Sequence, residues 1–273
     1  MAITMINLSS LDGSNGFLLD GEALFAHFSG ASVSSAGDIN GDGFDDVMIG
    51  AYYEYRHYTL EGFSYVVFGK ASGFDAHFNL DNLDGSHGSR LDVGESNGVS
   101  VSGAGDVNGD GFDDVIVGAN NAGYVVFGQA AGFDAVRDLS SLDGSNGFRL
   151  KGVSTRDESV SSAGDINGDG FDDLIVSAGD SGVYVVFGKS SNFEATLDLS
   201  SLDGSNGFHL IDLENSPFIS VSNAGDINGD GFDDVIIGDG FAGLNGENSG
   251  SSCVVFGKAS GFTATFDLSH IFH

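Results

Sequence analysis

One nine-residue pattern, Asp-x-Asn-Gly-Asp-Gly-Phe-Asp-Asp, occurs four times in this 273-residue chain and constrains its fold more than any other feature. The copies begin at Asp38, Asp106, Asp165 and Asp226. Oxygen-bearing side chains at alternate positions, a glycine at the sixth and an acid at the ninth suit a hard cation, so each copy predicts a calcium-binding loop. A single repeat cannot bury its own apolar face, so four copies predict one continuous repeat domain over residues 1–273.

Short apolar runs follow every acidic loop. The loop leads into a run such as Val115-Ile-Val, and a Tyr-Val-Val-Phe-Gly segment comes next, with Cys253 in place of Tyr in the last unit. These runs are rich in β-branched and aromatic residues and are bounded by Gly, Asn, Asp and Ser, which is typical of strands joined by turns. A mixed segment such as 133–142 is predicted as an outer fourth strand. Four antiparallel strands in about sixty residues predict a β-propeller blade.

The repeat boundaries follow from these segments. We expect repeats at 12–83, 84–142, 143–202 and 203–271, with residues 1–11 as an extra copy of the outer strand. The predicted fold is an all-β propeller of four blades. Because the outer-strand segment occurs five times for four loops, a surplus copy could close the ring. A larger propeller, or a seven- or eight-bladed ring completed by a homodimer, remains open, and a β-solenoid is disfavoured because its rungs are much shorter.

The repeated segment Gly-Asp-x-Asn-Gly-Asp-Gly-Phe-Asp-Asp-Val-Ile-x-Gly resembles the FG-GAP repeat of the integrin α-chain N-terminal β-propeller, and the resemblance covers essentially the whole chain. In that family the loop between the two inner strands of a blade wraps one calcium ion. The resemblance therefore implies about four calcium ions, held by side chains at the first, third, fifth and ninth positions and by the carbonyl at the seventh. The implied ligands are Asp38, Asn40, Asp42, Phe44 and Asp46; Asp106, Asn108, Asp110, Phe112 and Asp114; Asp165, Asn167, Asp169, Phe171 and Asp173; and Asp226, Asn228, Asp230, Phe232 and Asp234. Asp45 and its counterparts are expected to face solvent.

Three other interpretations of the loop are disfavoured. An EF-hand needs a bidentate acid at the twelfth position and flanking helices, whereas that position is apolar in all four copies, as at Ile49 and Val117. Paired acids such as Asp45 and Asp46 can serve in acid–base catalysis. An active site is normally unique, however, and this pair recurs four times, so we expect that the chain is not an enzyme. A turn that binds nothing would bring carboxylates together without a cation to offset their repulsion.

Composition limits the partners and the compartment. A net charge of −31 excludes nucleic acid as a natural partner and argues against docking on anionic lipid. No apolar stretch reaches membrane-spanning length, so no membrane insertion is expected. No cleavable signal peptide is visible at the start of the chain. Cys253 is predicted to be a buried strand residue. The acidic composition and the resemblance together imply a secreted or cell-surface protein.

A ligand site is expected in sequence segments that the other repeats lack, because the repeated segments build the scaffold. Units one and four carry insertions of about eight or nine residues in the same connection, and the first insertion holds four of the seven tyrosines. If four blades close into a ring, these insertions lie side by side. We therefore hypothesise a protein or glycan site built from Tyr52, Tyr53, Tyr55, Arg56, His57, Tyr58, Phe241 and Asn245. The alternative is a tyrosine-rich loop that caps the axis or makes an oligomer contact.

The function predicted from these features is a calcium-stabilised, non-enzymatic adhesion or recognition module that acts outside the cell. Two alternatives remain open. One is a lectin-like or accessory propeller of a secreted carbohydrate-active protein, and the other is a structural spacer in a large surface protein.

Overall fold

The chain forms a four-bladed β-propeller in which each blade is built on three consecutive antiparallel strands. The computed structural model describes residues 7–21, 28–53, 61–93, 97–119, 122–130, 133–153, 159–190, 192–211, 219–243 and 249–268. The three strands are β2 (Phe28–Gly37), β3 (Asp46–Tyr53) and β4 (Glu61–Val67) in blade one; β7 (Asn97–Gly105), β8 (Asp114–Ala119) and β9 (Ala122–Val126) in blade two; β12 (Val160–Gly164), β13 (Asp173–Ser177) and β14 (Val183–Val186) in blade three; and β17 (Ile219–Gly225), β18 (Asp234–Asp239) and β19 (Ser251–Val255) in blade four.

Two outer strands extend each of the first three blades. The fourth strand runs antiparallel to the third, and a short fifth strand, contributed by the following repeat, pairs with the fourth in parallel. The fourth strands are β6 (Gly88–Asp92), β11 (Gly147–Lys151) and β16 (Gly207–Ile211), and the fifth strands are β10 (Val136–Asp138), β15 (Thr196–Asp198) and β20 (Thr265–Asp267). At the start of the chain β1 (Leu18–Asp20) pairs in the same parallel way with β5 (His77–Asn79).

The prediction of the fourth strand was therefore wrong in detail. The segment 133–142 supplies the short fifth strand of the preceding blade, and the fourth strand comes from the Gly-Phe-x-Leu sequence after the following turn. The cause is local chemistry, because Asp138 accepts a hydrogen bond from the Ser140 N–H and starts a 3-10 turn, η3 (Leu139–Ser141), that ends the strand. The equivalent turns are η1 (Leu8–Ser10), η2 (Leu80–Asn82) and η5 (Leu199–Ser201), and a further one is η4 (Gly179–Ser181).

The core lies mainly between neighbouring blades, where the apolar middle strands are covered on both faces. The six residues of β8, for example, are all buried. The first strands of successive blades pack side by side, β2 on β7, β7 on β12 and β12 on β17. Serine, alanine and glycine along these strands permit the close approach. This is visible at Gly103, where an added Cβ would lie 2.8 Å from the Ser35 carbonyl oxygen.

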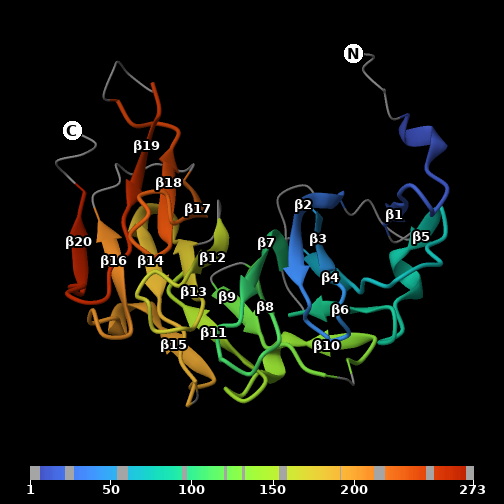
Figure 1. Cartoon of the computed structure of the whole chain (residues 1–273), viewed down its shortest axis with the longest axis horizontal. Helices are drawn as coiled ribbons and strands as arrows, with labels where there is room; N and C mark the ends of the chain where they lie inside the picture. Colours follow the sequence, from blue (N-terminus) through green and yellow to red (C-terminus); the bar gives the residue numbers. More distant parts are fainter. Residues whose placement is uncertain are drawn as a thin grey trace.

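The blades follow an arc that begins with β1 and β5 and ends with β18, β19 and β20 (Figure 1). Blades one and four therefore lie at its opposite ends. In the described part of the chain no strand ladder joins them, because β17, β18 and β19 form a separate three-stranded sheet and β1 pairs only with β5. Among the described residues, none forms a helix long and apolar enough to cross a membrane.

Candidate functional site

Each acidic loop is held in shape by its own side chains. The Asp38 carboxylate accepts hydrogen bonds from the N–H groups of Asp42 (3.0 Å) and Gly43 (2.8 Å). The Asn40 side-chain oxygen also accepts from Asp42 N–H (2.8 Å), and Asp42 in turn accepts from Phe44 N–H (3.0 Å). The other three loops repeat this arrangement. The residues that the pattern requires thus also fix the turn.

The ninth residue of each loop is a buried carboxylate. In the second loop, Asp114 accepts hydrogen bonds from Val107 N–H and Gly128 N–H, both at 2.9 Å, and so ties the loop to the end of β9. Asp46, Asp173 and Asp234 make the equivalent pairs of bonds. All four side chains are buried.

Burial makes three of these carboxyl groups much weaker acids than usual. Desolvation raises the pKa of Asp46 to about 7 and the pKa of Asp114 and Asp173 to about 8, because the charged form is disfavoured away from water. The charges of the first and fifth acids of the same loop, Asp106 and Asp110 for Asp114, act in the same direction. A buried negative charge among like charges is a setting in which a divalent cation is favourable.

The donor set fits a hard cation. Each ionised carboxylate has about four acceptor sites, and the backbone N–H groups use only part of them. The first, third, fifth and ninth side chains therefore keep oxygen lone pairs for an ion, which is the chemistry calcium prefers. In this structure, no three acidic, histidine or cysteine side chains of the described ranges converge in the geometry of a bound metal.

The eighth residue of the loop joins neighbouring blades, and the expectation that it faces solvent was wrong for three of the four copies. The Asp113 carboxylate of blade two accepts a hydrogen bond from Asp38 N–H of blade one at 2.8 Å. Asp172 and Asp233 accept in the same way from Asp106 N–H (2.8 Å) and Asp165 N–H (2.9 Å). The recurrence of this aspartate in all four loops was the available signal. Sequence reasoning missed it because the partner lies in the preceding repeat.

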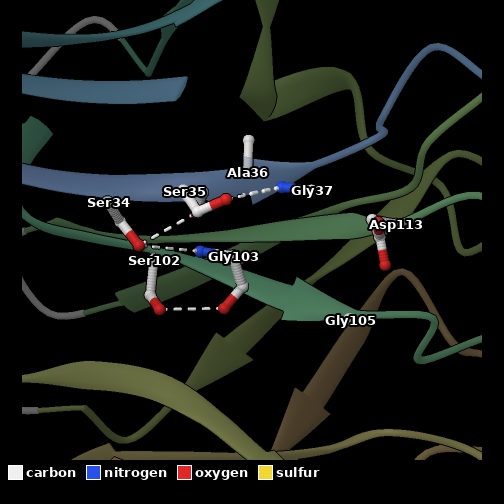
Figure 2. A pocket seen from close by; sticks show the side chains of 8 residues that line it. All are labelled: Ser34, Ser35, Ala36, Gly37, Ser102, Gly103, Gly105 and Asp113. Atoms are coloured by element: carbon white, nitrogen blue, oxygen red, sulfur yellow. Dashed lines mark hydrogen bonds between the residues drawn. The ribbon is translucent and has the colours of Figure 1, made fainter. Parts of the chain in front are cut away.

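The junction between blades one and two also contains a hollow of about 240 Å³. Figure 2 shows its lining, which comes from β2, β7 and the second loop: Ser34, Ser35, Ala36, Gly37, Ser102, Gly103, Gly105 and Asp113. Across it the Ser34 hydroxyl accepts a hydrogen bond from Gly103 N–H at 3.4 Å. The lining consists of serine, alanine and glycine residues and one aspartate, without a large apolar side chain, so the hollow belongs to the inter-blade contact rather than to a deep apolar ligand pocket.

The predicted ligand site falls largely outside the described residues, which exclude Tyr55, Arg56, His57, Tyr58 and Asn245. The backbone of Tyr52 and Tyr53 ends β3. Phe241 follows β18, is partly exposed and donates its N–H to Asp239 at 2.9 Å. Blades one and four, whose sequences carry the insertions, lie at opposite ends of the arc (Figure 1).

Cys253 occupies the predicted buried position on β19. Burial raises the pKa of its thiol to about 11. The thiol is therefore protonated at neutral pH and suits packing rather than nucleophilic chemistry.

Comparison with known proteins agrees with this architecture. The FG-GAP repeat family matches residues 29–67, 97–132, 158–191 and 218–254, which together make up more than half of the chain. Each matched segment contains one acidic loop and the strands on either side of it.

Relatives include integrin alpha-3 of Cricetulus griseus, 31% identical over 58% of this chain and 15% of the relative. Integrin alpha-7 of Homo sapiens is 31% identical over 58% of this chain and 13% of the relative. Integrin alpha-4 of Xenopus laevis is 37% identical over 38% of this chain and 9% of the relative. The chain thus matches only a small part of each. With four matched repeats and four blades of the corresponding structure, the chain belongs to the FG-GAP repeat family and has an integrin-like β-propeller fold.

Proposed function

We propose that each of the four acidic loops binds one calcium ion and that the ions stabilise the propeller. The observation that supports this most is the buried ninth carboxylate of each loop. In the first three loops its pKa is raised by desolvation and by the neighbouring acids of the same loop. A cation there would offset both unfavourable effects. Binding to the folded loop but not to the unfolded chain stabilises the fold by mass action.

The second loop illustrates the proposed ligand set. Asp106, Asn108, Asp110 and Asp114 would supply side-chain oxygens, and Phe112 would supply its carbonyl. The ion itself would contribute charge neutralisation and a cross-link between the two ends of the loop. Modules of this kind that work outside the cell bind calcium with dissociation constants of roughly 10⁻⁴ to 10⁻³ M.

Calcium titration of the metal-free chain by isothermal calorimetry tests this proposal. We expect about four sites per chain, and about three in Asp110→Asn, which removes one ligand charge but leaves an oxygen to accept the Phe112 N–H. Asp143→Asn is the matched control, because Asp143 lies in an exposed turn outside the loops, where it bonds Ser145, and should keep all four sites. No heat of binding at millimolar calcium would contradict the proposal.

We further infer that the propeller is a non-enzymatic adhesion or recognition module that acts outside the cell. Similarity to integrin alpha chains supports a module that binds protein partners, and the calcium affinities expected for such loops suit extracellular calcium better than cytosolic calcium. Net charge of −31 favours partners with basic or neutral surfaces.

Binding of the calcium-loaded chain to arrays of extracellular matrix proteins and of glycans tests this second part. We expect saturable binding to a protein partner that is lost in EDTA. Retention of specific binding on glycans alone would favour the lectin-like alternative. Hydrolysis of a polysaccharide by the isolated chain would contradict a non-enzymatic role.

A further inference from the structure

The face of blade one that points away from blade two exposes apolar side chains whose counterparts are buried. Val33 on β2 is 69% exposed, whereas the equivalent Val101 on β7 is 4% exposed because blade one covers it. Phe44 and Val47 are exposed in the same way, although the counterpart of Val47 in blade two, Val115, is fully buried. Within the described ranges, the first blade thus lacks the preceding blade that covers each later one.

The opposite face of blade four shows the complementary defect. Ile227 is 57% exposed and Phe256 is 53% exposed, whereas their counterparts in blade three, Ile166 and Phe187, are buried. Val254 on β19 is likewise exposed. Single exposed apolar residues are common, but here they gather on the two end faces of a repeated array, which marks interaction surfaces.

The end faces of blades one and four also carry complementary hydrogen-bonding groups: one has the acceptor and the other has the donor of an inter-blade junction. Each internal junction uses the N–H of the first loop residue in one blade and the carboxylate of the eighth loop residue in the next, as in Asp165 and Asp233 (2.9 Å). Each internal junction also uses the carbonyl oxygen of the second loop residue, as in the hydrogen bond that Lys258 N–H donates to the Ile166 carbonyl at 2.9 Å. Within the described residues, Asp45 of blade one accepts no such bond and the Asp226 N–H of blade four donates none.

Glycine packing repeats the same asymmetry. The ring of Phe232 in blade four covers Gly168 of blade three, where an added Cβ would lie 2.3 Å from the ring. The equivalent Gly229 of blade four has no atom of the described chain within 4 Å of that position. The equivalent ring in blade one, Phe44, covers no such glycine among the described residues.

The outer strands complete the match. The third strand of each of the first three blades pairs with a fourth strand. Among the described strands, β19 of blade four has no such partner and β1 has no antiparallel neighbour. In blade three Phe187 lies against the stacked rings of Phe208 and Phe262, at centroid distances of 6.0 and 5.2 Å. At the chain start Phe17 and Phe74 form the same stacked pair at 4.5 Å, and the half-exposed Phe256 is the third ring that fits it.

From these complementary end faces we propose that a second copy of this chain docks head to tail, with blade four of each copy packed on blade one of the other. β1 and β5 of one copy then extend β19 of the other and supply the missing outer strands. The contact is heterologous, and such contacts give closed rings when the rotation closes. Two arcs of four blades joined at both ends make one ring of eight blades, which lies within the size range of propellers.

Mass measurement by light scattering, with calcium present, tests the assembly. The wild-type chain is expected at about twice 28.0 kDa. Val33→Asp and Val254→Asp each place a charge on one end face, so each should give a folded monomer, with folding checked by circular dichroism. Val136→Asp is the matched control: Val136 is also exposed but lies on β10, away from both end faces, and this variant should remain dimeric.

A cysteine cross-link tests the strand pairing itself. The register of the other blades places Tyr184 opposite His209, and the same register puts Cys253 of one copy opposite Leu18 of the other. Leu18→Cys should therefore give a disulfide-linked dimer on mild oxidation, whereas Val136→Cys should not. A monomeric wild-type chain, an open series of higher oligomers, or a disulfide formed within a single Leu18→Cys chain would overturn the proposal.

Discussion

The backbone N–H of Asp38 donates a hydrogen bond of 2.8 Å to the carboxylate of Asp113, 75 residues further along the chain. This bond joins the first residue of one acidic loop to the eighth residue of the next. It places the loops in direct contact along the arc, so the loops serve both as candidate ion sites and as joints between blades.

Removal of that joint should cost stability only where a neighbouring blade is present. Asp113→Ala leaves the partly buried Asp38 N–H without its acceptor, so we expect a loss of about 1–3 kcal/mol in the free energy of unfolding. Asp45→Ala changes the same position of the first loop, where the described part of the chain provides no neighbouring loop, and should alter stability by less than about 0.5 kcal/mol. Urea denaturation at concentrations where the chain is monomeric compares the two variants, and equal losses would contradict the assigned role.

Alanine substitutions at two equivalent glycines distinguish the cost of backbone strain from the cost of disturbed packing between blades. Gly109 (φ +72°) and Gly229 (φ +75°) have nearly the same backbone, so alanine is strained at both. At Gly109 the added Cβ would also meet the Phe171 ring at 2.3 Å, whereas at Gly229 no atom of the described residues lies within 4 Å of it. Gly109→Ala should therefore destabilise the monomer by about 1–3 kcal/mol more than Gly229→Ala, from overpacking alone. Denaturation curves that coincide would show that the ring does not pack there.

The aromatic contacts predict a graded response. Phe193 is buried against Phe148 at 4.7 Å and Phe127 at 5.2 Å. Phe193→Ala should reduce the free energy of unfolding by about 3–5 kcal/mol. Among the described residues, the Phe74 ring stacks on one ring, Phe17, and has the Lys70 ammonium 4.9 Å from its centroid, so Phe74→Ala should cost clearly less in the monomer. A larger loss for Phe74→Ala in chemical denaturation would contradict this ranking.

The sequence was sufficient to predict the repeat, the all-β blades and the acidic loops, because period, β-branched runs and turn residues are local signals. The prediction of the fourth strand was misplaced, because it did not account for Asp138, whose side chain caps η3 and so ends β10. Sequence reasoning also missed the role of Asp113, whose partner Asp38 lies one repeat earlier. Contacts between repeats depend on how blades stack, and no spacing within a single repeat reports them.

Thermal unfolding of the chain in 10 mM calcium and in EDTA tests the central claim most directly. If four loops bind calcium with dissociation constants of roughly 10⁻⁴ to 10⁻³ M, the combined stabilisation should raise the Tm by at least about 10 °C. Magnesium at the same concentration serves as the control for ionic strength, and we expect it to give a smaller rise because it demands near-ideal octahedral geometry. A Tm that is the same in calcium and in EDTA would contradict the account.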